Sequence, residues 1–172
     1  MGAGKKPRVC QGKAVDVKFI ADVHLAKVAK YLRLLGFDTL YFRHIEDDIL
    51  VKFSQQRIVL TKDRALAKRS KNIYLVQSKE IKKQLIEVLR HFAISSCHPF
   101  TRCLIDNTLL QRVAKEHIIN RLPPRIKQDF NQFWICPRCQ RLYWHGSHYE
   151  RMLEVVYEVC GEIRAQVVLV DE

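Results

Sequence analysis

The sequence predicts an α/β fold, in which an open parallel sheet with helices on both faces is followed by a small cysteine-rich segment. Short apolar runs alternate four times with helical patterns in fewer than a hundred residues. Alternation of this kind is typical of parallel sheets, whose crossover connections pass over the faces as helices. A second observation, the gathering of Cys, His and aromatic residues after residue 96, indicates a different structure beyond the sheet.

The four predicted strands are short apolar runs, and they occupy residues 17–21, 38–42, 57–61 and 72–76. Runs of this length, bounded by polar residues or Gly, are typical of buried strands. Right-handed crossovers place the carboxyl ends of such strands at one edge of the sheet. Parallel α/β sheets have their functional sites at that edge.

The predicted helices alternate with these strands. After the first strand, Leu25, Val28, Leu32 and Leu35 fall on one helical face, and Gly36 provides a C-terminal stop. Three further helical patterns complete the alternation.

The second of these helices is expected to begin at the Asp47–Asp48 pair, because Asp is a favoured N-cap. Residues 62–70 predict a short basic helix or turn, and Ser78 is expected to cap a long amphipathic helix.

After Phe92 the pattern changes. We expect a short helix over 108–118, a break at 122–124, and a helix over 149–159. The predicted units are a sheet domain over 17–95, a ribbon-like segment over 96–150, and a closing helix with an acidic tail over 151–172.

The chain has 172 residues and a formal net charge of +12, with a sequence pI of about 9.6. A basic balance of this size favours a nucleic-acid partner, because Lys and Arg contact phosphates and release counterions; the alternative is a merely basic protein. No apolar run approaches the length of a membrane span, and the basic start lacks the apolar core of a secretory signal. We therefore expect a cytoplasmic protein with no membrane partner.

Acidic residues follow the predicted strands. Asp22 ends the first strand, Asp63 lies just past the third, and Asp47 and Asp48 begin the helix between them. Carboxylates that meet at one edge are suitable ligands for Mg²⁺, which can activate water for attack on a phosphodiester. The alternative is that each Asp only caps a helix or turn.

The ordered motifs resemble a known family. FIADVHLAKVAKYLRLLGFDTLYF, DDILVKF and RIVLTKDRALAKR are followed by RCLIDN, WICPRC and LYWHGSHYERM. Together, from Lys18 to Leu153, they resemble the Mut-seven C-terminal RNase family, which has a PIN-like fold and a zinc ribbon. The resemblance implies an RNA-cleaving nuclease that uses acid-bound Mg²⁺ or Mn²⁺.

The family's acids carry over to positions in this sequence. Asp22 matches the acid of the first motif, and Asp63 matches the acid of the third. Asp47 fits the middle acid best, with Asp48 as the neighbouring alternative. PIN-like sites often have a fourth acid, for which Glu80 is the candidate.

The resemblance also implies a structural Zn²⁺ site, with one departure from the family pattern. Where the family has CxxC in the first knuckle, this chain has Cys103 followed by Asp106. The implied ligands are Cys103, Asp106, Cys136 and Cys139. The alternatives are that Cys97 or His98 replaces Asp106, that the metal is lost, or that the intact CxxC is a redox pair.

Basic and aromatic residues near these motifs suggest contacts with RNA. Lys62, Arg64 and Arg33 are the predicted phosphate-binding residues. Trp144 could stack on an unpaired base or belong to the ribbon's core, and His148 is a spare zinc ligand or a packing residue.

The sequence thus predicts a metal-dependent nuclease, and the resemblance selects RNA as substrate. Two alternatives keep the same fold: a non-catalytic RNA-binding module, and a toxin-type RNase with an antitoxin protein as partner.

Overall fold

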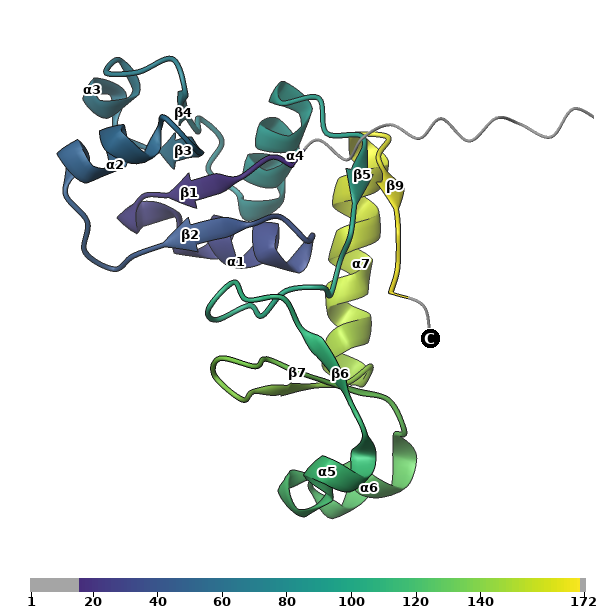
Figure 1. Cartoon of the computed structure of the whole chain (residues 1–172). Coiled ribbons are helices and arrows are strands. Elements are labelled where there is room, and N and C mark those ends of the chain that lie inside the picture. The colour runs from purple at the N-terminus through teal and green to yellow at the C-terminus, as the bar shows by residue number, and fades with distance from the viewer. Residues whose placement is uncertain (1–15, 171–172) are drawn as a thin grey trace, which may run out of the picture.

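The computed structural model describes residues 16–170 and consists of two lobes joined by one long helix. The sheet lobe, residues 19–92, lies at the upper left in Figure 1, and the ribbon lobe, residues 102–146, lies below it. Helix α7 (Ser147–Glu162) runs from the ribbon lobe up to the sheet lobe. The basic start of the chain, in which no secretory signal is expected, lies outside the described residues.

The sheet lobe is built on a parallel sheet whose strands are β1 (Phe19–Ala21), β2 (Thr39–Tyr41), β3 (Ile58–Thr61) and β4 (Ile73–Leu75). Their order is β2-β1-β3-β4, and every neighbouring pair is parallel. All four predicted strands are confirmed. The chain leaves β1 toward β2 on one side and then crosses to β3 on the other, so the order reverses beside β1. Such a reversal leaves a crevice at the carboxyl edge of the sheet.

Helices cover both faces of this sheet, as predicted. On one face, α1 (Ala26–Leu34) and α4 (Ile81–His91) pack against Phe19 and Ala21. On the other face, α2 (Asp47–Phe53) and α3 (Arg64–Ala67) pack against Ile20. Successive strand residues point to opposite faces, so both faces of β1 are buried in apolar cores.

The predicted end of the first helix is confirmed. The apolar stripe continues from a single 3₁₀ turn, Val23–Leu25, into α1, and Leu32 and Leu35 are buried. Gly36 has φ +95°, and a Cβ at this position would lie 2.2 Å from the carbonyl oxygen of His98. Only Gly fits a turn with this backbone conformation and this close approach.

Two predicted caps are wrong. The N-cap of α2 is Glu46, and Asp47 and Asp48 lie in the first helical turn. The N-cap of α4 is Glu80, and the backbone N–H of Ser78, two residues earlier, donates to the Glu87 carboxylate.

The ribbon lobe contains a three-stranded antiparallel sheet of β6 (Gln111–Val113), β7 (Phe133–Ile135) and β8 (Leu142–Tyr143). The segment between β6 and β7 forms α5 (Lys115–Ile118), η2 (Ile119–Arg121) and α6 (Pro124–Asp129). The predicted helix over 108–118 is wrong in its first half, where β6 pairs with β7. Tertiary pairing has overridden the local preference.

The closing helix α7 packs back on the sheet lobe, as expected. Val156, Val159 and Cys160 are buried in the same core as α1 and α4. Two short strands, β5 (Ser96–Cys97) and β9 (Gln166–Val167), pair in parallel beside the upper end of α7. None of the described helices is both long and apolar enough to cross a membrane.

Candidate active site and metal centre

Two of the predicted acids are joined through one hydroxyl at the carboxyl edge of the sheet. Thr61, the last residue of β3, donates its hydroxyl to Asp22 Oδ2 over 2.5 Å. The hydroxyl oxygen of Thr61 in turn accepts from the backbone N–H of Asp63 over 3.0 Å. Asp22 follows β1 and Asp63 follows β3, which are neighbouring parallel strands, so the topology alone delivers both carboxylates to one place.

Both acids also cap the start of a helix or turn, which is the role that the alternative interpretation gives them. Asp63 Oδ1 accepts from the N–H groups of Ala65 and Leu66 at the start of α3, at 2.7 and 3.1 Å. Asp22 Oδ1 accepts from the N–H of His24. Asp22 is 5% exposed, whereas Asp63 is exposed, and Asp63 Oδ2 accepts no hydrogen bond from residues 16–170.

The Asp47–Asp48 pair separates into two environments. Asp48 Oδ1 accepts from Arg69 over 2.6 Å, and this hydrogen bond and charge lower the pKa of Asp48. Asp47 is exposed in the first turn of α2 and has no ion pair within the described part of the chain. Of the two, Asp47 therefore has the carboxylate available for another ligand.

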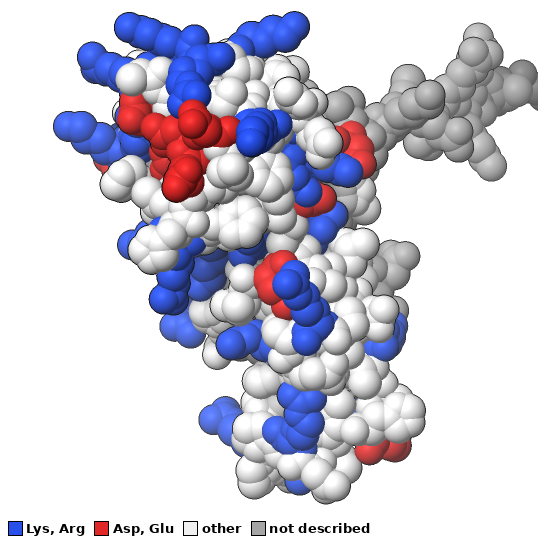
Figure 2. Space-filling model, turned by 60° about the vertical axis from the view of Figure 1, so that its left-hand side comes forward, with Lys and Arg blue, Asp and Glu red and all other residues white. Residues whose placement is uncertain are grey.

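The predicted acids gather at one edge but do not form a closed metal cage. Figure 2, which brings the left side of Figure 1 forward, shows acidic side chains grouped on the upper lobe and surrounded by Lys and Arg. Among residues 16–170, the one group of three or more His, Cys, Asp or Glu with ligand atoms all within 4.8 Å lies elsewhere. Glu80, the fourth-acid candidate, pairs with Lys83 over 3.1 Å.

Arg33, a predicted phosphate-binding residue, has its guanidinium engaged inside the protein. Arg33 is 7% exposed, and its Nε donates to the carbonyl of Thr39 over 2.8 Å. Its Nη1 donates to the carbonyls of Leu104 and Ile105. Arg33 therefore ties α1 to β2 and to the ribbon lobe.

The other two predicted phosphate-binding residues lie beside the acids. Lys62 Nζ donates to the carbonyl of Ser78 over 2.6 Å, so this ammonium holds the loop after β4. Arg64 is exposed at the first position of α3, with no partner in the described part of the chain. Arg64 is thus a cation at this edge that is available for a phosphate.

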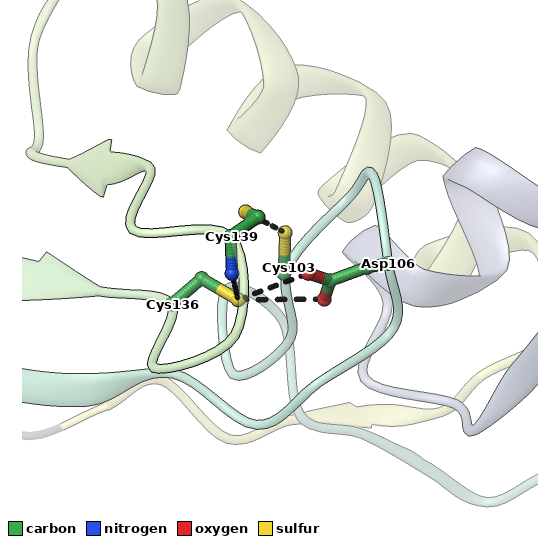
Figure 3. A group of neighbouring side chains, drawn as sticks. All are labelled: Cys103, Asp106, Cys136 and Cys139. Atoms are coloured by element: carbon green, nitrogen blue, oxygen red, sulfur yellow. Dashed lines mark hydrogen bonds between the residues drawn. The ribbon is translucent and has the colours of Figure 1, made fainter.

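One group of side chains has ligand atoms that all lie within 4.8 Å of one another. It is the predicted zinc set, Cys103, Asp106, Cys136 and Cys139. Figure 3 shows the four side chains turned toward one another from two loops, one in each knuckle. Cys136 Sγ lies 3.3 and 3.4 Å from the two oxygens of Asp106, and Cys103 Sγ lies 3.7 Å from Cys139 Sγ. Three sulfurs and one oxygen from two short loops form a set that a tetrahedral Zn²⁺ can occupy.

With this geometry in place, the comparisons with known proteins decide the family. The profile of the Mut7-C RNase domain matches residues 17–156, from just before β1 to the middle of α7. The chain belongs to the Mut7-C RNase domain family. No curated protein and no solved structure gives a significant match. Membership in the Mut7-C family implies a ribonuclease, and therefore an RNA substrate.

The charge states around the Mut7-C zinc set fit a cation. Burial opposes ionisation of Asp106, but hydrogen bonds from Thr108, Cys136 and Cys139 outweigh it and lower its pKa to about 2. Burial and the neighbouring thiols and carboxylate raise the pKa of Cys139 to about 11. A bound Zn²⁺ reverses this second effect, because a coordinated thiol deprotonates.

The substitute zinc ligands do not reach this Mut7-C cluster. Cys97 is fully buried and lies 2.8 Å from Cys160, measured between the sulfurs, and this contact with burial raises its pKa. His98 and His148 are exposed and lie outside the group of ligand atoms. Asp106 is therefore the fourth ligand that the structure offers.

Two functional side chains were not predicted from the sequence. Thr61 is the hydroxyl that joins the two acids, and Asn107 follows the ligand Asp106. Asn107 Oδ1 accepts from the N–H of Thr39 over 2.9 Å, and its Nδ2 donates to Asp38 over 2.7 Å. The sequence did contain a signal for Thr61. It is a small polar residue at the end of a predicted strand, and an acid, Asp63, follows two residues later.

Proposed function

We propose that this protein hydrolyses phosphodiester bonds in RNA, with Asp22, Asp63 and Asp47 holding Mg²⁺ or Mn²⁺. The observation that carries the proposal is the pair Asp22 and Asp63, joined by Thr61 at the reversal of strand order in a Mut7-C chain. The same edge is where parallel α/β sheets have their sites.

The wide spacing of the acids is compatible with Mg²⁺ rather than with a dehydrated cation. Mg²⁺ keeps several of its waters and is usually bound by one or two carboxylates together with substrate phosphate. We infer that Asp22 and Asp63 are the primary ligands and that Asp47 acts through water. The ion would activate a water and neutralise charge on the phosphodiester.

The residues around the acids have supporting roles. Thr61 and the backbone N–H of Lys62 fix Asp22 by donating to Oδ2. Oδ1 accepts from the N–H of His24, which leaves that oxygen a further lone pair for a metal. Arg64 lies next to Asp63 and is proposed to hold a backbone phosphate. Lys62 is proposed to keep the loop after β4 in place through Ser78, and so acts as a positioning residue.

The zinc set is proposed to be structural. Its four ligands leave no open position for substrate, as in other closed zinc sites. The set lies in the ribbon lobe, on loops that also supply the carbonyls of Leu104 and Ile105 to Arg33. The proposed zinc therefore holds the ribbon lobe against the sheet lobe and takes no part in hydrolysis.

The test uses labelled single-stranded RNA with Mn²⁺ and a double variant, Asp22→Asn/Asp63→Asn. Asn can still accept the cap hydrogen bonds through its amide oxygen, so the fold is expected to survive. The control is Glu116→Gln/Glu154→Gln, which removes two exposed carboxylates from α5 and α7. We expect cleavage by the wild type and the control, and loss of cleavage by at least about a hundredfold in the double variant.

Equal cleavage by the double variant and the control would overturn the proposed site. RNA binding by all three proteins without cleavage would favour the non-catalytic RNA-binding module. Recovery of activity only after removal of a small acidic protein that co-purifies would favour the toxin-type RNase.

A further inference from the structure

A pocket of about 550 Å³ lies between the two lobes, outside the proposed active site. Its walls come from α1, from the loop of the first knuckle, from α6, and from the segment that joins β8 to α7. A volume of this size is in the range of pockets that take a small ligand or one nucleotide. Its position at the junction makes it accessible to a strand that runs from one lobe to the other.

The charged residues of the pocket select an anion. Lys30, on α1, and Arg141, before β8, line it, and both are exposed without an ion-pair partner in the described part of the chain. Arg125 also lines it, and lies 3.5 Å from Asp129 in an exposed pair on α6. Asp129 is the one acidic residue in the lining, so cations are in excess.

The apolar part of the wall combines aliphatic side chains with aromatic rings, one of which is Trp144. Trp144 is half-buried, with one side on Phe133 of the ribbon core at a ring-centroid distance of 6.3 Å. Its indole N–H has no acceptor among residues 16–170. A Cβ at Gly146 would lie 3.0 Å from the indole nitrogen, so this Gly lets the backbone approach the ring. The pocket thus offers a ring face and a donor beside two free cations.

A flat π-system linked to a negative charge matches this combination, and a nucleotide has that chemistry. We propose that the pocket binds one nucleotide of the RNA substrate, with its base against Trp144 and its phosphate at Lys30 and Arg141. The inference rests on the proposed function, because it takes RNA to be the substrate.

The helical rise between Asp22 and Lys30 gives an approximate separation of the pocket from the acids. Lys30 follows Asp22 by eight residues, mostly helical, which is a span of about 12 Å at about 1.5 Å per residue. At about 3.4 Å per stacked nucleotide, the strand reaches the pocket roughly three nucleotides from the cleaved bond. Figure 2 shows Lys and Arg on both lobes of the face that it draws, so a strand could meet cations on each lobe. A dinucleotide at the acids is too short to reach it.

The first experiment measures binding of labelled single-stranded RNA without divalent ions, so that nothing is cleaved. We expect Lys30→Ala/Arg141→Ala to weaken binding about tenfold or more. We also expect the slope of log Kd against log salt to fall by about 0.7, because both cations are proposed to contact the same phosphate. The control, Lys18→Ala/Lys71→Ala, removes two exposed cations at the opposite, amino edge of the sheet, and is expected to change neither.

The second experiment reads the base contact through fluorescence. The chain has two Trp, and Trp134 is 7% exposed in the ribbon lobe, whereas Trp144 lines the pocket. We expect RNA to quench the wild-type emission, and the quenching to disappear in Trp144→Phe, which keeps an aromatic ring for the core. Quenching that persists in Trp144→Phe would place the base elsewhere.

Cleavage assays separate failure of this inference from failure of the proposed function. We expect Lys30→Ala/Arg141→Ala to raise KM for a long RNA about tenfold and to leave dinucleotide cleavage unchanged. Wild-type cleavage together with variant affinity equal to the control would overturn the pocket alone. RNA binding that depends on the pocket, without any cleavage, would overturn the proposed function alone. Tighter binding of an acidic peptide than of RNA, lost in the same variant, would overturn the nucleotide assignment.

Discussion

Replacement of Arg33 by Met tests the role that the structure gives to this buried cation. β2 is an edge strand, and its outer side is the side away from β1. There the carbonyl of Thr39 accepts from Arg33, and the N–H of Thr39 donates to Asn107. An uncovered edge strand exposes unpaired backbone groups, and these two side chains satisfy them. Arg33→Met keeps the aliphatic stem and removes only the donors.

The expected cost follows from where the three acceptors lie. Thr39 is 0% exposed, so its carbonyl loses its partner without gaining water, at about 1–3 kcal/mol. The carbonyls of Leu104 and Ile105 are in a loop that water reaches, so each lost bond costs about 0.5–1.5 kcal/mol. We expect the free energy of unfolding to fall by about 3 kcal/mol.

The assay is thermal or urea unfolding of Arg33→Met beside Arg64→Met, an exposed Arg on α3. For a domain of this size, about 3 kcal/mol lowers Tm by about 6–12 °C. We expect Arg64→Met to change stability by less than about 0.5 kcal/mol. If the two variants unfolded within about 1 kcal/mol of each other, Arg33 would not be the tie between the lobes.

Three further changes have expected outcomes. Asp106→Cys completes the four-thiolate set usual for structural zinc, so we expect zinc to be retained at higher chelator concentrations, measured by metal analysis. Burial opposes ionisation of Glu87, but backbone hydrogen bonds outweigh it and lower its pKa. This stability is present above the ordinary pKa and lost as pH falls through the folded one. Glu87→Gln should therefore destabilise at pH 7, with the difference shrinking toward pH 3 in acid unfolding curves. Gly36→Ala should cost at least about 2 kcal/mol in urea unfolding, since φ is +95° and His98 blocks the Cβ, whereas Gly161→Ala, in open space, should be neutral or stabilising.

Much of the sheet lobe could be predicted because its strands and helices carry their own patterns. Residues of β1 and β3 are buried on both faces, so each strand reads as a continuous apolar run. The first helix presents one apolar stripe and ends at Gly36, whose requirement for positive φ is local. Local signals of this kind survive folding because the tertiary structure agrees with them.

The ribbon lobe was predicted less well because its elements depend on distant partners. β6 consists of Gln111, Arg112 and Val113, mostly exposed, and only its pairing with β7 makes it a strand. Its partner follows twenty residues later. No local periodicity announces such a pairing, so the polar run was taken for a helix.

The positions of the acids could be predicted from the topology of the sheet, but the side chains around them could not. Asp22 and Asp63 follow neighbouring strands, which the alternation of elements already implies. Arg33 was assigned to the substrate by charge alone. Its spacing of four from Ala29, buried on the same face of α1, was the signal that its side chain turns inward.

One short loop connects the zinc set to β2, the edge strand of the sheet. This connection allows a test of whether zinc stabilises that edge. Asp106, a proposed ligand, directly precedes Asn107, whose Oδ1 holds the N–H of Thr39 on β2. Asn107 has φ +72°, in the left-handed region that Asn adopts more readily than most residues, so a metal on Asp106 would fix the chain directly before this turn.

Removal of zinc by a chelator should therefore release the Thr39 amide before the rest of the sheet. We expect hydrogen exchange at Thr39 to accelerate about tenfold or more, while Ile20, in the central strand β1, exchanges at its original rate. Uniform acceleration at both amides would mean that the metal stabilises the whole fold rather than this edge. No acceleration at either would mean that the loop holds β2 without an ion, and that the four ligands serve only as packing.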